Sequence, residues 1–386
     1  MLVIRNATLV TPDQTLAAGT VTIEDGRIQS TGAANASLPR GAAVRDATGL
    51  ILAPGFLDLQ VNGGLGLDFT ADPATIWQVA AALPRFGVTG FLPTIITSPA
   101  ATSRAAQEVL RAGPPPGWTG ARPLGLHLEG PFLNPGKKGA HNPAHLRHAS
   151  PEAIAGWSPE AAVRLVTLAP ELPWGLEAAA ELAARGVVVS AGHSLATFDE
   201  AAAGFDAGAR YATHLFNAMP PLHHREPGLI AAALADPRII VGLIPDGLHV
   251  HPALVGLIWQ LLGPERLNLV TDAMAAMGMD AGDYLLGDSR VTVDETSARL
   301  ADGTLAGCVL ALDAILRAFR SFTGAPLPAL LATVTTTPAR LLGIDGRIGR
   351  IAPGYDADLA LITPDLRVVE TFVGGQSVYR SDYPAD

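Results

Sequence analysis

The sequence predicts an α/β protein: a (β/α)8 TIM-type barrel with a small β-sandwich domain built from both chain ends. Three observations lead to this prediction. The middle of the chain alternates between apolar strand-like runs and helical patterns, and both ends carry short strands separated by turns. Chemically active side chains also stand directly after several of the central strands. We expect residues 1–52 and 346–386 to form the small domain and residues 53–345 the catalytic barrel.

The two chain ends show short apolar and β-branched runs that turn residues interrupt. Pro12-Asp13 and Asp25-Gly26 mark turns near the start. Neither end offers enough strands for a core of its own, so we expect the two ends to pair. The strand candidates are residues 2–4, 8–10, 19–23, 27–28, 346–349, 357–362 and 368–373.

The central part of the chain contains eight strand candidates, most of them separated by helical patterns. Eight such units over roughly 250 residues are typical of a (β/α)8 barrel. Residues 280–304 interrupt the alternation and predict an inserted hairpin. The strand candidates are 56–61, 88–96, 124–129, 164–168, 187–192, 210–215, 239–245 and 267–271, and the helical patterns include 74–86, 99–112, 174–185, 196–207 and 252–262.

Composition excludes several classes of protein. The 386 residues carry 26 basic and 36 acidic side chains, a formal net charge of −10, which argues against nucleic-acid or anionic-membrane binding. The single cysteine, Cys308, cannot form an intrachain disulfide and suits a reducing compartment. The first residues do not resemble a signal peptide, and no apolar run approaches the ~20 residues of a spanning helix. We therefore expect a cytoplasmic protein.

Four side chains stand at the ends of separate predicted strands. Glu129, His193, His214 and Asp272 follow strands three, five, six and eight. In a (β/α)8 barrel these strand ends meet at one face, where catalytic residues lie. Two histidines and one glutamate form a ligand set for a catalytic zinc-type metal with an open position. Asp272 would then serve as the general base that handles the proton of an activated water. The pattern predicts a hydrolase.

Each of these residues also has an ordinary explanation when it is taken alone. Glu129 would be a rim carboxylate paired with an arginine, and His193 or His214 a hydrogen-bonded core histidine. Asp272 would cap the following helix. The convergence of three candidate ligands at one face favours the metal site, because an unpaired buried carboxylate is costly.

Three further residues lie in loops at the same face. His141 follows strand three and His249 follows strand seven; either suits a hydrogen bond to a polarised carbonyl or to an anion. Arg225 lies in the loop after strand six and suits bidentate recognition of a phosphate, with Asn217 and Ala218 just upstream. The alternative is that the two histidines are ordinary residues of the barrel rim and that the arginine is simply solvated.

At these residues the chain resembles the N-acetylglucosamine-6-phosphate deacetylases of the amidohydrolase superfamily, over essentially its whole length. The resemblance implies that Glu129, His193 and His214 hold the metal, that Asp272 is the acid/base, and that His141 polarises the acetyl carbonyl. The matching segments are residues 54–63, 127–143, 192–194, 212–219, 225–228, 246–249, 271–273 and 305–307.

The resemblance also implies a substrate site and a partner. The histidine that matches His249 reaches the phosphate from the neighbouring subunit in the family, so a homodimer with shared active sites is implied. One divalent ion per subunit is implied, Zn²⁺ before Fe²⁺, Co²⁺ or Mn²⁺. The residues expected to bind the sugar phosphate are Gln60, Ala140, His141, Asn217, Ala218, Arg225, His249, Leu305, Ala306 and Gly307.

The chain departs from many amidohydrolases at the end of strand one. A His-Xaa-His motif for a second metal is common there, whereas this chain has Gln60-Val61-Asn62. Amide side chains are poor substitutes for imidazole at a transition metal. No lysine follows strand four to bridge two ions. We therefore expect a single metal. Cys308 stands where the family pattern leads us to expect serine.

The expected reaction is metal-dependent hydrolysis of the acetamide of N-acetylglucosamine 6-phosphate, giving glucosamine 6-phosphate and acetate. A related substrate, N-acetylgalactosamine 6-phosphate or a cyclic amide, is the alternative within the enzyme class. A non-catalytic sugar-phosphate-binding protein is the alternative outside it. The small-molecule phosphosugar is the only partner expected besides the second subunit.

Overall fold

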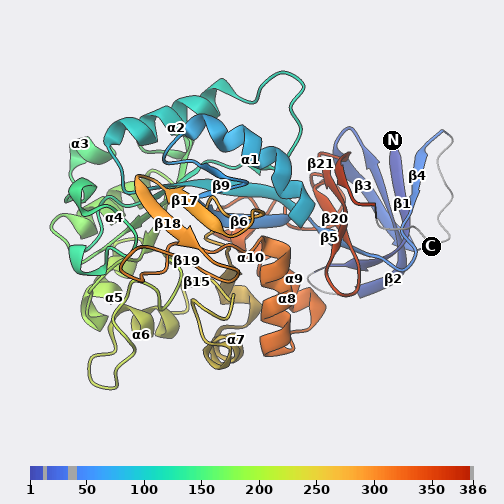
Figure 1. Cartoon of the computed structure of the whole chain (residues 1–386). Helices are drawn as coiled ribbons and strands as arrows, with labels where there is room; N and C mark the ends of the chain where they lie inside the picture. Colours follow the sequence, from blue (N-terminus) through green and yellow to red (C-terminus); the bar gives the residue numbers. More distant parts are fainter. Residues whose placement is uncertain (12–14, 34–40, 383–386) are drawn as a thin grey trace.

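The computed structural model describes residues 1–11, 15–33 and 41–382 and contains the predicted barrel (Figure 1). Parallel strands follow one another in sequence order around it. The backbone N–H of Asn62 donates to the carbonyl of Ala273 at 2.7 Å, so the first strand meets the segment after the last and nearly closes the barrel. The strands are β6 (Phe56–Val61), β9 (Val88–Ile96), β11 (Leu126–Glu129), β12 (Val163–Leu168), β13 (Val188–Ala191), β14 (Tyr211–Ala212), β15 (Ile240–Leu243) and β16 (Leu267–Leu269).

Helices cover the outside of the barrel, and each predicted helical pattern contains one. The pattern over 74–86 is split, because 3-10 turns flank its α-helix and Pro84 lies in the second turn. Thr197 and Glu200 form a reciprocal capping box at the start of α5. None of the described helices is long and apolar enough to cross a membrane. The helices are α1 (Ile76–Ala82), α2 (Ala100–Ala112), α3 (Pro151–Ile154), α4 (Gly175–Ala184), α5 (Phe198–Asp206), α6 (Gly228–Ala235), α7 (Pro252–Arg266), α8 (Leu312–Thr323), α9 (Leu327–Ala332) and α10 (Thr336–Leu341).

The two chain ends pair in one eight-stranded sheet, which lies beside the barrel in Figure 1. Ile51 lies opposite Ile362, so the joining pair is β5 with β20. The side chains of Ile4, Leu52 and Phe372 contribute to a separate apolar core. The strands are β1 (Leu2–Val10), β2 (Thr15–Glu24), β3 (Arg27–Ala33), β4 (Ala43–Asp46), β5 (Ile51–Pro54), β20 (Leu359–Ile362), β21 (Val368–Val373) and β22 (Gln376–Arg380).

Some local predictions for the chain ends differ from the structure. Residues 346–349 form turns and bends rather than a strand, and β4, β5 and β22 were not predicted. Gly349 has a φ of 86°, a left-handed conformation that a strand does not contain. The predicted turn at Pro12-Asp13 lies outside the described residues. The proposed domain boundaries, 52/53 and 345/346, stay a prediction.

The inserted hairpin occurs where it was expected, between residues 280 and 304. It comprises β17 (Gly282–Leu286), β18 (Ser289–Val293) and β19 (Ala298–Arg299). Its tip is anchored to the barrel, since the buried carboxylate of Asp68 accepts a hydrogen bond from the Gly287 N–H at 3.1 Å. The hairpin thereby brings Leu286 and Arg299 to the wall of the cavity described below.

Candidate active site

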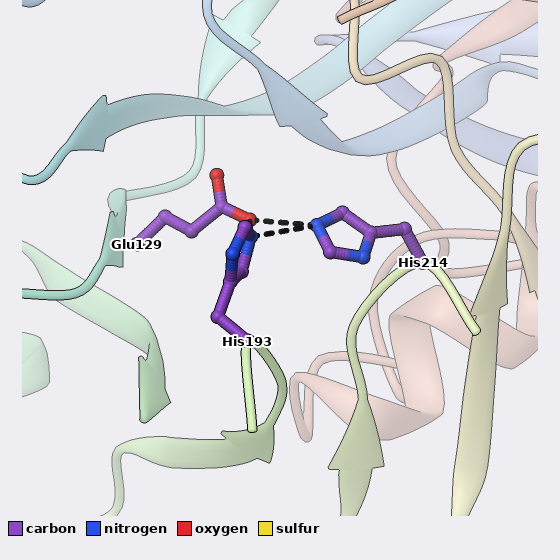
Figure 2. Close-up of side chains that lie close together, drawn as sticks. All are labelled: Glu129, His193 and His214. Atoms are coloured by element: carbon purple, nitrogen blue, oxygen red, sulfur yellow. Dashed lines mark hydrogen bonds and ion pairs between the residues drawn. The ribbon is translucent and has the colours of Figure 1, made fainter. Parts of the chain in front are cut away.

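Side chains at the ends of three barrel strands converge at one point. Glu129 ends β11, His193 follows β13 and His214 follows β14, and Figure 2 shows their polar atoms pointing toward one another. Glu129 Oε1 lies 3.2 Å from His193 Nε2 and 3.0 Å from His214 Nε2, and the two nitrogens are 3.1 Å apart. All three residues are buried. The predicted ligand set is therefore assembled in the folded chain.

The backbone at these strand ends adopts conformations that non-glycine residues rarely adopt. His193, His214 and Asp272 have φ values of 49°, 29° and 52°. Left-handed conformations at such residues cost about 1–3 kcal/mol each and cluster at functional sites. Here they end the strands and turn the chain into the loops around the cavity. Three of the strained positions in the described chain are therefore residues that the site requires.

The hydrogen bond of His193 leaves its second nitrogen free to bind a cation. Its Nδ1 lies 2.9 Å from the carbonyl oxygen of Lys137, and a carbonyl can only accept, so Nδ1 carries the hydrogen. In the neutral imidazole, Nε2 then directs a lone pair at Glu129 and His214. A lone pair that faces the Glu129 carboxylate at 3.2 Å is stabilised by a hydrogen on His214 Nε2 or by a metal ion that replaces that hydrogen. A tetrahedral ion with bonds of about 2.0–2.1 Å would separate its ligand atoms by about 3.3 Å, which fits the observed spacing.

Two amide side chains occupy the positions where a second metal would need imidazoles. Gln60 Nε2 donates to Glu129 Oε1 at 3.0 Å, and Asn62 Nδ2 donates to Asp272 Oδ1 at 2.7 Å. Within the described part of the chain, the three residues of Figure 2 form the single group of His, Cys, Asp and Glu with metal-ligand spacing. The amides of Gln60 in β6 and of Asn62 just after it thus orient the carboxylates of the site, and the structure supports a site for one ion.

Asp272 is a buried carboxylate on the wall of the same cavity. Burial, reinforced by the nearby charge of Glu129, raises its pKa to about 6. Such a value is suited to a group that must both accept and return a proton near neutral pH. The Asn62 amide occupies Oδ1, which leaves Oδ2 for the proton. Asp272 therefore lines the same cavity as the ligand group with a raised pKa, and its assignment as the general base stays a prediction.

His141 presents an N–H to the cavity. The backbone N–H of Thr97 donates to His141 Nδ1 at 3.2 Å, so this nitrogen is unprotonated and the hydrogen lies on Nε2. Burial, and then the neighbouring His193, lower the pKa of His141 to about 3, which keeps the ring neutral. Its Nε2 is 3.7 Å from Glu129 Oε2, and the side chain lines the cavity. His141 is therefore built as a hydrogen-bond donor.

A cavity of about 400 Å³ joins these groups. Most of the residues predicted for the site line it: Glu129, Ala140, His141, His193, His214, Asn217, Ala218, His249, Asp272, Leu305 and Gly307. Gln60 and Ala306, also predicted, lie behind the wall with 1% and 0% of their surface exposed. The lining residues that were missed include Asn62, Lys137, Leu286, Arg299 and Thr304.

Comparisons with known proteins agree with this geometry. Residues 51–378 match the family model described as the amidohydrolase family. The human N-acetylglucosamine-6-phosphate deacetylase is 40% identical, over 88% of this chain and 86% of its own. The N-acetylgalactosamine-6-phosphate deacetylase of Escherichia coli O157:H7 is 38% identical over 97% and 98%. The chain belongs to the amidohydrolase family.

A solved structure places this amidohydrolase more narrowly. It is a mutant of the N-acetyl-D-glucosamine-6-phosphate deacetylase from Mycobacterium smegmatis in complex with N-acetyl-D-glucosamine-6-phosphate. The TM-score is 0.89 at 36% identity, with 98% of this chain and 99% of the other covered. Sequence relatives and fold therefore both place the chain among the amino-sugar-phosphate deacetylases of the amidohydrolase family.

The single chain places two of the predicted substrate residues of this amidohydrolase differently. The side chain of His249 is buried at the wall of its own chain's cavity, and the expectation that it reaches a neighbouring subunit stays a prediction. Arg225 does not line that cavity and stands exposed in the loop before α6. A motif identifies a residue type, whereas the path of the loop decides which cavity the side chain faces.

Proposed function

We infer that the protein hydrolyses the acetamide of N-acetylglucosamine 6-phosphate and releases acetate and glucosamine 6-phosphate. The observation that carries this inference is the buried group of Glu129, His193 and His214 beside Asp272, in a chain whose close relatives are deacetylases. Nucleophile activation, proton transfer and oxyanion stabilisation each have a candidate group at the cavity wall. This division of roles is what hydrolysis of an unactivated amide needs.

Glu129, His193 and His214 would hold one divalent metal. We propose Zn²⁺, which takes this ligand set in catalytic sites; Fe²⁺, Co²⁺ and Mn²⁺ accept the same donors. When bound, the ion supplies Lewis-acid chemistry that activates water and polarises a carbonyl. The Lys137 carbonyl and the Gln60 amide orient two of the ligands, the supporting role that outer-shell groups have in metal sites.

Asp272 and His141 would divide the work on the substrate. Asp272 takes the proton of the attacking water and transfers it to the sugar nitrogen as the C–N bond breaks. His141 donates Nε2–H to the acetyl oxygen as negative charge develops there. Asn62 and Thr97 keep the two groups in these roles, because each bonds to the atom that does not face the reaction.

Replacing His141 by glutamine is expected to lower kcat by roughly 10²- to 10³-fold, because a preorganised donor to the oxyanion is lost. The longer and more flexible Gln side chain does not hold its amide donor in the fixed place that the contact with the Thr97 N–H gives to the imidazole. Steady-state kinetics on N-acetylglucosamine 6-phosphate measures the effect. If kcat stays within about threefold of wild type, another group stabilises the oxyanion.

The phosphate would be bound by cationic side chains at the mouth of the cavity. Lys137 and Arg299 line it in this structure, and Arg299 has no carboxylate partner among the described residues. Hydrogen bonds to Ser297 Oγ at 3.2 Å and to the Gly303 carbonyl at 2.9 Å hold its guanidinium in place. This fixed, unpaired cation favours an anionic sugar over a neutral cyclic amide.

The substrate preference is tested by measuring acetate release from three sugars. We expect kcat/KM to be at least about 100-fold higher for N-acetylglucosamine 6-phosphate than for N-acetylglucosamine, the value of one or two charge-assisted hydrogen bonds. N-acetylgalactosamine 6-phosphate is the third substrate, because one relative is named for it. A higher kcat/KM for this epimer would reassign the substrate and leave the site chemistry intact. Equal rates with and without phosphate would contradict the anion site.

We further propose a cytoplasmic homodimer. An apolar stripe on α7 supports the dimer: Leu254, Leu257 and Leu261 share one face and are 40%, 59% and 60% exposed. The one cysteine of the chain is a buried free thiol, which fits a reducing compartment.

A further inference from the structure

Asp246 and His249 form a close pair at the wall of the active-site cavity. Asp246 lies just after β15, and His249 lines the cavity. Asp246 Oδ2 and His249 Nδ1 are 2.6 Å apart, and the two side chains are 4% and 6% exposed. A carboxylate can accept at this distance, so Nδ1 carries the hydrogen. Nε2 is then the atom that His249 offers to the cavity.

The carboxylate of Asp246 is itself held rigidly by the loop. Its Oδ1 accepts the backbone N–H groups of Leu248 at 2.9 Å and His249 at 2.8 Å. Gly247 makes this turn with a φ of 83°, and a Cβ there would approach the Phe322 ring to 3.3 Å. Asp246 therefore cannot rotate away from the imidazole without losing two backbone hydrogen bonds.

The surroundings favour an ionised Asp246 with His249 as its partner. Burial alone would raise the pKa of Asp246, but the His249 side chain and the two backbone donors hold it below its usual value. Burial, with the adjacent Asp246 charge, raises the pKa of the Cys308 thiol, which therefore stays neutral. Among the described residues, His249 is the one basic side chain in an ion pair with Asp246.

We propose that Asp246 is a positioning residue for substrate binding: it fixes a hydrogen on Nδ1 of His249 and directs Nε2 at the bound sugar phosphate. When Nε2 carries its own hydrogen it donates to a phosphate oxygen, and when it does not it accepts from a ring hydroxyl. The proposal rests on the proposed function, because it takes the sugar phosphate as the ligand of this cavity. A buried carboxylate orients the histidine of acyl-transfer triads in the same way. Here the imidazole is a binding group, since Asp272 already supplies the base.

The test is a double-mutant cycle of Asp246→Asn, His249→Asn and the double variant, assayed with N-acetylglucosamine 6-phosphate and with N-acetylglucosamine. For the phosphosugar, each single variant is expected to raise KM roughly 10- to 100-fold, with kcat within about threefold of wild type. The double variant is expected to match His249→Asn, because Asp246 acts only through that ring. Asp206→Asn, at an exposed carboxylate on α5, is the matched control.

The outcomes separate this inference from the proposed function. If wild type releases acetate neither from N-acetylglucosamine 6-phosphate nor from N-acetylgalactosamine 6-phosphate, the proposed function is wrong. If wild type is active and Asp246→Asn leaves KM unchanged, the positioning role is wrong. The role is also wrong if the increase in KM of the double variant equals the product of the increases of the two single variants. A loss with the phosphosugar alone places the His249 contact at the phosphate, and an equal loss with both sugars places it at a ring hydroxyl; either supports positioning.

If Asp246→Asn does not fold, the position of the hydrogen on His249 can be measured in the wild-type protein instead. In ¹⁵N-histidine NMR spectra, with His249 assigned by comparison with His249→Asn, we expect the hydrogen on Nδ1. A neutral ring with its hydrogen on Nε2 would overturn the proposal.

Discussion

Replacing Asp272 by asparagine is expected to lower kcat by about 10³- to 10⁴-fold while KM changes less than about threefold. The amide has the shape of the carboxyl group but cannot take a proton from water or return one to the sugar nitrogen. Its oxygen can still accept the hydrogen bond from Asn62, so the cavity keeps its form. Steady-state kinetics with saturating metal gives both constants.

The pH dependence of wild type provides a second readout of Asp272. Burial and then the Glu129 charge raise its pKa to about 6 in the metal-free chain, and a cation beside it lowers that value. The base must be unprotonated, so turnover falls as the pH drops through this pKa, at or below about pH 6. The residual rate of Asp272→Asn should lack this acidic limb. If Asp272→Asn with full metal content kept near-normal turnover, proton transfer would belong to another group.

Replacing Glu129 by glutamine is expected to remove both the metal and the activity. The amide cannot supply the carboxylate charge that balances the ion, and His193 and His214 alone make an incomplete ligand set. We expect kcat/KM to fall at least about 10³-fold at equimolar metal, because both nucleophile activation and carbonyl polarisation depend on the ion. Acetate release and the metal content after gel filtration measure the two effects.

The same substitution is expected to abolish stabilisation by metal. A ligand at about 1,000 times its Kd stabilises the folded state by about 4 kcal/mol, so metal raises the Tm of wild type. The Tm of Glu129→Gln should not respond, whereas Glu181→Gln, at a half-buried position of α4 outside the cavity, should respond like wild type. A variant that retains one equivalent of metal would show that Glu129 is not a ligand.

Protons compete with the metal for this site. Although burial opposes its charged form, the Glu129 carboxylate raises the pKa of His214 in the metal-free chain. Because a ligand histidine must be neutral, metal affinity is expected to weaken as the pH falls through the His214 pKa.

The strand-and-helix alternation was readable from sequence, and the exact strand ends were not. The strand predicted over 210–215 is present as β14, which covers only Tyr211–Ala212. The φ of 29° at His214 turns the chain out of the sheet, a conformation that side-chain type does not reveal. Pairing of the chain ends followed from the shortage of strands at each end, and the structure confirms it.

The candidate ligands were predictable because the barrel brings all strand ends to one face. The groups that set the protonation of His193 and His141 were not predictable. The Lys137 carbonyl and the Thr97 N–H are backbone groups, which the side-chain sequence does not mark. Arg299 reaches the cavity through the inserted hairpin, which the Asp68–Gly287 hydrogen bond and apolar packing hold over the barrel. No local pattern in the sequence marks that contact.

The most direct test of the account is a titration of chelated, metal-free protein with Zn²⁺ while acetate release from N-acetylglucosamine 6-phosphate is followed. We predict that the rate rises in proportion to added metal and reaches its plateau at one equivalent per chain, and that Glu129→Gln stays inactive throughout. A plateau only at two equivalents, or no acetate at any loading, would contradict a single-ion deacetylase.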